Sequence, residues 1–185
     1  MGSFCVKSAG KSLGKLIADS MLGNIAKKLR LFGQDVVYFK NGNDEELLNR
    51  YKNRTLITGD RELYLKSKRT HRKAILIDST VSDESVALAK IFFLINENPS
   101  DTPLRCTLCN GILRPANENE RRSVPEKVIK NNLNIYVCTK CKKLYWYGRH
   151  WDSIKMLKNS VIEQLNMLRA GQSDSIYVKN KSDKI

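Results

Sequence analysis

Long apolar runs are absent from this 185-residue sequence. Its longest run, Ile91-Phe-Phe-Leu-Ile95, has five residues, whereas a helix that crosses a bilayer needs about 20. The first residues also lack the apolar core of a signal peptide, and Val6 stands where a myristoylation site has Ser or Thr. We therefore expect a cytoplasmic protein with no membrane partner.

Acidic residues are few beside basic ones: 19 Asp and Glu against 33 Lys and Arg give a formal net charge of +14. The excess is spread over the chain, with +6 in residues 1–100 (17 basic, 11 acidic) and +8 in residues 101–185 (16 basic, 8 acidic). Both halves would attract a polyanion, and nucleic acid is the natural candidate. The alternative is a basic isoelectric point with no bearing on the partner.

Cysteine is also scarce, and four of the five cysteines form two Cys-x-x-Cys pairs. Cys106 and Cys109 make the first pair, Cys138 and Cys141 make the second, and Cys5 stands alone. Two such pairs are the ligand set of a tetrahedral Zn²⁺ whose closed, all-sulfur site is structural, not catalytic. Two labile disulfides, a redox dithiol and an iron–sulfur cluster are the alternatives.

Short apolar segments alternate with helical patterns in the first half of the chain. The expected strands are residues 15–18, 35–39, 55–58 and 74–77, and the helices that follow them begin near Asp19, Asp44, Arg61 and Asp83. Near-continuous apolar strands are typical of a parallel sheet that is buried on both faces. The expected fold class is α/β, a three-layer sandwich with a mostly parallel sheet.

The composition becomes polar and proline-containing at Asn96-Glu-Asn-Pro-Ser-Asp-Thr-Pro103, which predicts a linker between domains. We expect three units: an α/β domain over residues 13–97, a zinc ribbon over 102–151, and an amphipathic helix with a disordered tail over 152–185. The metal would supply much of the folding free energy of so small a ribbon.

Three acids occupy comparable places in the alternating region. Asp60 follows the strand 55–58, Asp19 closes the strand 15–18, and Asp44 opens the helix after the strand 35–39. Because ligands bind at the carboxyl ends of the strands in such sheets, the three acids predict a divalent-metal site. For each acid the alternative is a helix cap or a turn residue.

Basic and aromatic residues are interleaved after the last cysteine, in Lys142-Lys-Leu-Tyr-Trp-Tyr-Gly-Arg149-His150-Trp151. Bases stack on aromatic rings while cations hold phosphates, so this segment suits single-stranded nucleic acid. The alternative is that rings such as Tyr145 and Trp146 fill the interior of the ribbon. His150 is a candidate substrate contact, although a lone histidine more often has a packing role.

Several motifs in order resemble the PIN-like RNase family known as the Mut-seven C-terminal domain. They are Asp19-Ser-Met-Leu-Gly, Leu29-Arg-Leu-Phe-Gly, Asp44-Glu-Glu-Leu-Leu, Leu56-Ile-Thr-Gly-Asp60 and Arg105-Cys-Thr-Leu-Cys-Asn-Gly, then Tyr145-Trp146 with Gly148 and His150. The resemblance covers residues 13 to 151. It implies a PIN-type fold with a fused zinc ribbon and endoribonuclease activity at acids that bind Mg²⁺ or Mn²⁺.

By position, the resemblance gives Asp19, Asp44 and Asp60 as the metal-binding catalytic acids and Thr58 as their small polar partner. We assign the fourth acid to Asp78, with Asp83 as the alternative, and expect Glu45 to assist beside Asp44. The expected substrate contacts, besides Thr58, are Lys27, Lys28, Arg30, Arg61, Arg149 and His150.

The resulting hypothesis is a metal-dependent endoribonuclease whose ribbon binds RNA, including ribosomal RNA, or a ribonucleoprotein. One or two Mg²⁺ ions held by carboxylates would activate water and stabilise the developing charge. The second hypothesis is a non-catalytic RNA-binding or ribosome-assembly factor that keeps the fold. The third is a toxin-like nuclease that a partner protein silences.

Overall fold

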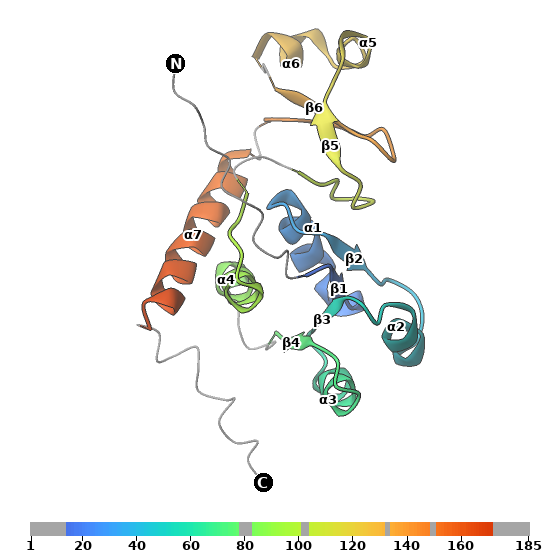
Figure 1. The fold of residues 1–185 in the computed structure, drawn as a ribbon. Helices are drawn as coiled ribbons and strands as arrows, with labels where there is room; N and C mark the ends of the chain where they lie inside the picture. The colour runs from blue at the N-terminus through green and yellow to red at the C-terminus, as the bar shows by residue number, and fades with distance from the viewer. Residues whose placement is uncertain (1–13, 78–82, 101–103, 132–133, 149–150, 172–185) are drawn as a thin grey trace, which may run out of the picture.

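A four-stranded parallel sheet forms the centre of the N-terminal domain (Figure 1). The computed structural model describes residues 14–77, 83–100, 104–131, 134–148 and 151–171. The strands are β1 (Leu16–Ala18), β2 (Val36–Tyr38), β3 (Thr55–Thr58) and β4 (Ala74–Leu76), in the spatial order β2-β1-β3-β4. Every pairing between them is parallel, which confirms the predicted α/β class.

Helices cover both faces of this sheet. Strand β1 is apolar throughout and fully buried, with Leu16 and Ala18 in one hydrophobic cluster and Ile17 in the other, because alternate side chains of a strand point to opposite faces. Helices α1 (Gly23–Leu31) and α4 (Glu84–Ile95) lie on the first face, and α2 (Asp44–Arg50) and α3 (Arg61–Arg69) on the second (Figure 1). The predicted three-layer arrangement is confirmed.

The C-terminal helix α7 (Trp151–Arg169) packs against α4 (Figure 1). Val161, Leu165 and Leu168 on its inner face are buried in the same cluster as Phe92 of α4. The sequence predicts this helix as a unit apart from the α/β domain, but in the structure it packs onto α4 and shares the core of that domain. The tail from residue 172 onward lies outside the described residues.

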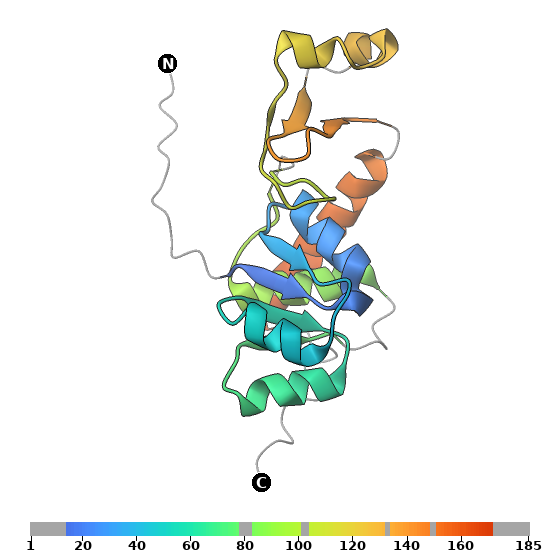
Figure 2. The same cartoon turned by 90° about the vertical axis from the view of Figure 1, so that its right-hand side faces the viewer.

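The cysteine-containing segment folds as a separate small antiparallel sheet. Its strands are β5 (Leu113–Pro115), β6 (Ile135–Cys138) and β7 (Leu144–Trp146), with the short helices α5 (Glu118–Arg121) and α6 (Glu126–Asn131) between β5 and β6. Figures 1 and 2 show these elements beyond the end of α1, away from α2 and α3. None of the helices in the described ranges is long and apolar enough to cross a membrane.

The first cysteine turn is attached to the α/β domain by partly buried polar contacts. From α1, Nη1 of Arg30 donates to the carbonyl oxygens of Thr107 (2.7 Å) and Leu108 (3.2 Å). The Asn110 side chain donates to Oδ1 of Asp35 (2.7 Å), just before β2. These bonds fix the cysteine turn against the edge of the sheet.

Candidate active site and metal centre

The order of the strands reverses between β1 and β3, which places Asp19 and Asp60 at neighbouring strand ends. After β1 the chain passes to α1 on one face of the sheet, and after β3 it passes to α3 on the other. This is the topological switch point at which open α/β sheets bind ligands. The two acids closest to it in sequence are Asp19, directly after β1, and Asp60, two residues after β3.

Asp19 is almost completely buried, and protein donors surround its carboxylate. Oδ1 accepts the backbone N–H groups of Met21 (3.0 Å) and Leu22 (3.2 Å) and so caps the 3₁₀ turn η1 (Ser20–Leu22). Oδ2 accepts the Thr58 hydroxyl and the Gly59 N–H (3.2 Å). A carboxylate has about four acceptor positions, and all four are occupied, so Asp19 joins the end of β1 to the end of β3.

Asp60 uses only one of its two carboxylate oxygens in the same way. Oδ1 accepts the N–H groups of Glu62 (2.7 Å) and Leu63 (3.2 Å), which makes Asp60 the N-cap of α3. Its own N–H donates to the Thr58 hydroxyl oxygen (2.9 Å). Across the described residues, no group hydrogen-bonds to Oδ2, and the half-buried side chain can offer this oxygen to a ligand.

The Thr58 hydroxyl therefore connects the two acids. It is fully buried, donates to Asp19 and accepts from the backbone of Asp60. The structure thus brings together three of the residues that the sequence assigns to the site.

The remaining predicted acids do not join this group. Asp44 is the exposed first residue of α2, whose cap is Asn43, and Glu45 beside it is also exposed. Asp83 caps α4, and its hydrogen bonds from Ser85 lower the pKa of its carboxyl. Asp78 lies outside the described residues. Within those residues, no three acids have ligand atoms close enough to share one metal ion.

The donor set nevertheless fits a divalent cation in part. Mg²⁺ and Mn²⁺ prefer oxygen ligands, and Mg²⁺ often takes one or two carboxylates and keeps several waters. Asp60 provides one free oxygen, whereas a cation at Asp19 has to displace the Thr58 hydroxyl or the Gly59 N–H. Among the described residues, Asp44 has no ligand atom close enough to those of Asp19 and Asp60 to complete the predicted three-acid metal site.

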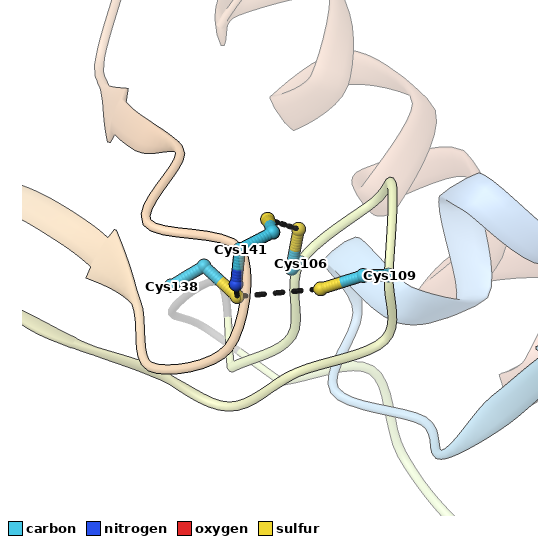
Figure 3. Close-up of side chains that lie close together, drawn as sticks. All are labelled: Cys106, Cys109, Cys138 and Cys141. Carbon is cyan, nitrogen blue, oxygen red and sulfur yellow. Dashed lines mark hydrogen bonds between the residues drawn. The ribbon is translucent and has the colours of Figure 1, made fainter.

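The four paired cysteines form a compact sulfur cluster, shown in Figure 3. Their Sγ atoms all lie within 4.8 Å of one another. The pair Cys106 and Cys141 is separated by 3.5 Å and the pair Cys109 and Cys138 by 3.4 Å. Four sulfurs at about 2.3 Å from a tetrahedral Zn²⁺ lie roughly 3.8 Å apart, so these sulfurs could hold a metal ion such as zinc.

The surroundings of the cluster lower the pKa of two thiols, Cys106 and Cys138, and raise the pKa of Cys109. Burial opposes ionisation of Cys106, but hydrogen bonds from the Tyr145 hydroxyl and from the Cys109 and Leu108 N–H groups outweigh it and lower its pKa to about 6. Burial and the neighbouring sulfurs raise the pKa of Cys109 to about 12. Full ionisation of the cluster therefore calls for a cation between the sulfurs.

Gly111 lies against the sulfur cluster and has no room for a side chain. A Cβ at this position would lie 2.7 Å from Sγ of Cys138 and 2.9 Å from Cβ of Lys140. Gly111 closes the motif Arg105-Cys-Thr-Leu-Cys-Asn-Gly, but the sequence alone did not predict that it lies against Cys138. The close approach allows the two cysteine turns to meet.

The aromatic residues after the last cysteine differ in their exposure in the structure. The Tyr145 hydroxyl hydrogen-bonds to Sγ of Cys106 (3.1 Å) and accepts the Thr107 N–H (3.2 Å), and its ring packs against the small core of the ribbon. Trp146 is partly exposed. For Tyr145 the interior role is confirmed.

The basic residues that were predicted to contact the substrate differ in their exposure and in their partners. Lys27 and Arg61 are exposed. Nζ of Lys28 lies 3.8 Å from Oε2 of Glu84. Arg30 is only 5% exposed and binds three carbonyl oxygens, of Val36, Thr107 and Leu108. The substrate-binding role predicted for Arg30 does not fit this placement, because its guanidinium holds the ribbon to the domain. Arg149 and His150 lie outside the described residues.

Comparison with known proteins identifies a family. No curated protein matches the chain, and no solved structure matches it. The Mut7-C RNAse domain model matches residues 14–157, well over half of the sequence and across both the sheet and the cysteine cluster. The chain therefore belongs to the Mut7-C RNAse domain family.

Proposed function

We propose that this protein is a metal-dependent endoribonuclease that cleaves RNA at the Asp19–Asp60 edge of the sheet. Membership of the RNase family supports RNA as the substrate, and the net charge of +14 suits a polyanion. The observation that carries the proposal is the pair of carboxylates at the switch point, held together by Thr58, with one oxygen of Asp60 available.

In this proposal the chain's own residues orient a divalent cation and the scissile phosphate. When bound, Mg²⁺ or Mn²⁺ lowers the pKa of water and stabilises the charge that develops on the phosphate. Asp60 would hold the cation through Oδ2, and Asp19 would take part after the Thr58 hydroxyl turns away. Arg61, exposed beside Asp60, and Lys27 would attract the phosphates of the strand. The Zn²⁺ that we assign to the four cysteines would be structural.

The end groups of the product test this proposal. An RNA labelled at its 3′ end should be cut internally in Mg²⁺ or Mn²⁺, and in-line attack by water should leave a 5′-phosphate and a 3′-hydroxyl. Products with a 2′,3′-cyclic phosphate would contradict the proposal, because attack by the ribose hydroxyl needs no such cation site. Intact RNA under all metal conditions would also contradict it.

The second candidate, a non-catalytic RNA-binding factor, is favoured by one observation. Protein donors already occupy all the acceptor positions of Asp19, as they would for a carboxylate that only connects two strands. Such a factor should retain its affinity for RNA and its cellular role after Asp60→Asn. The endoribonuclease should retain its affinity but lose its activity.

A further inference from the structure

A cavity lies where the ribbon, the end of α1 and the start of α7 meet. Its volume is about 530 Å³, within the roughly 300–1,000 Å³ of small-ligand sites. Phe32, Tyr147 and Trp151 contribute aromatic walls, and Ile154 adds apolar surface. The rings of Tyr147 and Trp151 meet edge to face, with centroids 4.2 Å apart. This aromatic lining suits a flat, partly apolar group.

Two cations border the same cavity. Lys155 and Lys158 lie one turn apart on α7, and both line it. Of the residues that the structure describes, those lining the cavity include no acidic side chain. An aromatic wall beside lysines matches the chemistry of one nucleotide, because a base stacks on rings while its phosphate pairs with cations.

The exposed side of α1 runs from this cavity toward the edge of the sheet at Asp19 and Asp60, here called the acid edge. Leu31 lines the cavity, and Lys27 and Asn24 precede it by four and seven residues, so all three share one face of the helix. Asp19 caps the turn that begins at Ser20, and at 1.5 Å per residue the cavity is roughly 18 Å from it. That distance corresponds to about five stacked nucleotides at 3.4 Å each.

We propose that this cavity binds a nucleotide of a single-stranded RNA whose neighbouring stretch runs along α1 to the Asp19–Asp60 edge. The part about the edge rests on the proposed function, while binding in the cavity does not require cleavage. The cavity would determine how far from a bound nucleotide the strand is cut.

The test compares two variants with the same change of charge. Lys155→Glu/Lys158→Glu alters the cavity, whereas Lys66→Glu/Lys68→Glu alters exposed lysines of α3 on the other face of the sheet. Affinity for an oligouridine RNA of about 12 nucleotides is measured by fluorescence anisotropy at several salt concentrations, without added Mg²⁺. Lys155→Glu alone, at an exposed position, replaces the double variant if the latter loses stability.

The cavity variant should bind roughly tenfold more weakly, and its salt dependence should flatten by about 1.4 log units per log unit of salt, about 0.7 for each lost phosphate contact. The α3 variant should stay within about twofold of wild type. Equal losses in both variants, no loss in the cavity variant, or no binding by the wild type would each overturn the proposal. Cleavage assays separate the two proposals. If the cavity variant cuts and binds RNA like the wild type, only the proposal about the cavity is wrong. If RNA binding depends on the two lysines but the wild type does not cut RNA, only the proposed nuclease activity is wrong.

Discussion

The Thr58 hydroxyl is a single group that connects Asp19 to the backbone of Asp60. It donates to the buried Oδ2 of Asp19 and accepts the Asp60 N–H. Thr58→Val keeps the shape but leaves both partners short of a hydrogen bond, which should lower the free energy of unfolding by about 1–3 kcal/mol. Denaturant unfolding measures this loss. Thr55→Val, at the half-buried start of the same strand, is the matched control, and an equal loss there would refute the role of Thr58.

Metal binding by the sulfur cluster should depend on the absence of a side chain at Gly111. In Gly111→Ala the new methyl group would overlap Sγ of Cys138, so the purified variant should lose most of its bound metal, as measured by elemental analysis. In Gly148→Ala the nearest atom would be 3.7 Å away, and metal content should not change. Full occupancy in both variants would show that the two turns can separate without losing the site.

At the scale of elements, the ribbon depends on Arg30 of α1. Burial lowers the pKa of its guanidinium, and the charge is stabilised by the carbonyls of the first cysteine turn. Arg30→Met leaves these carbonyls unpaired and should destabilise the protein by roughly 2 kcal/mol or more. Lys27→Met, on the exposed side of the same helix, should change stability by less than about 0.5 kcal/mol. Similar thermal shifts in both variants would contradict the attachment.

Sequence patterns predicted where the strands and helices lie better than they predicted what these elements pack against. Strand β3 was expected at the bounds where it lies, 55–58, because its run Thr-Leu-Ile-Thr is rich in the β-branched residues that favour strands. The apolar face of α7 was also predicted, but periodicity does not indicate what a face covers. Arg30 looked like a surface cation because its burial depends on the ribbon, which is distant in sequence. Asp44 follows a strand as the other two acids do, yet stands exposed at its helix start.

At the scale of the whole molecule, the two sheets should differ in their dependence on metal. Among the described residues, the ribbon buries only a small set of side chains, Cys106, Leu113, Val124, Ile135, Val137 and Cys138. The α/β domain has a much larger apolar core, which it shares with α7. Treatment with a strong Zn²⁺ chelator should therefore expose the amides of β6 to hydrogen exchange while those of β1 and β3 remain protected. Protection of β6 after complete metal removal would show that the ribbon folds without its ion.

The most direct test of the account is RNA cleavage by Asp60→Asn in Mg²⁺ and Mn²⁺. Asn caps a helix about as well as Asp, so α3 should still begin correctly, while an amide nitrogen replaces the oxygen that we assign to the cation. Glu163→Gln, an exposed site on α7, removes the same charge elsewhere. We predict metal-dependent cutting by the wild type and Glu163→Gln, and a loss of at least about 100-fold in Asp60→Asn. Cutting by Asp60→Asn at the wild-type rate would contradict it.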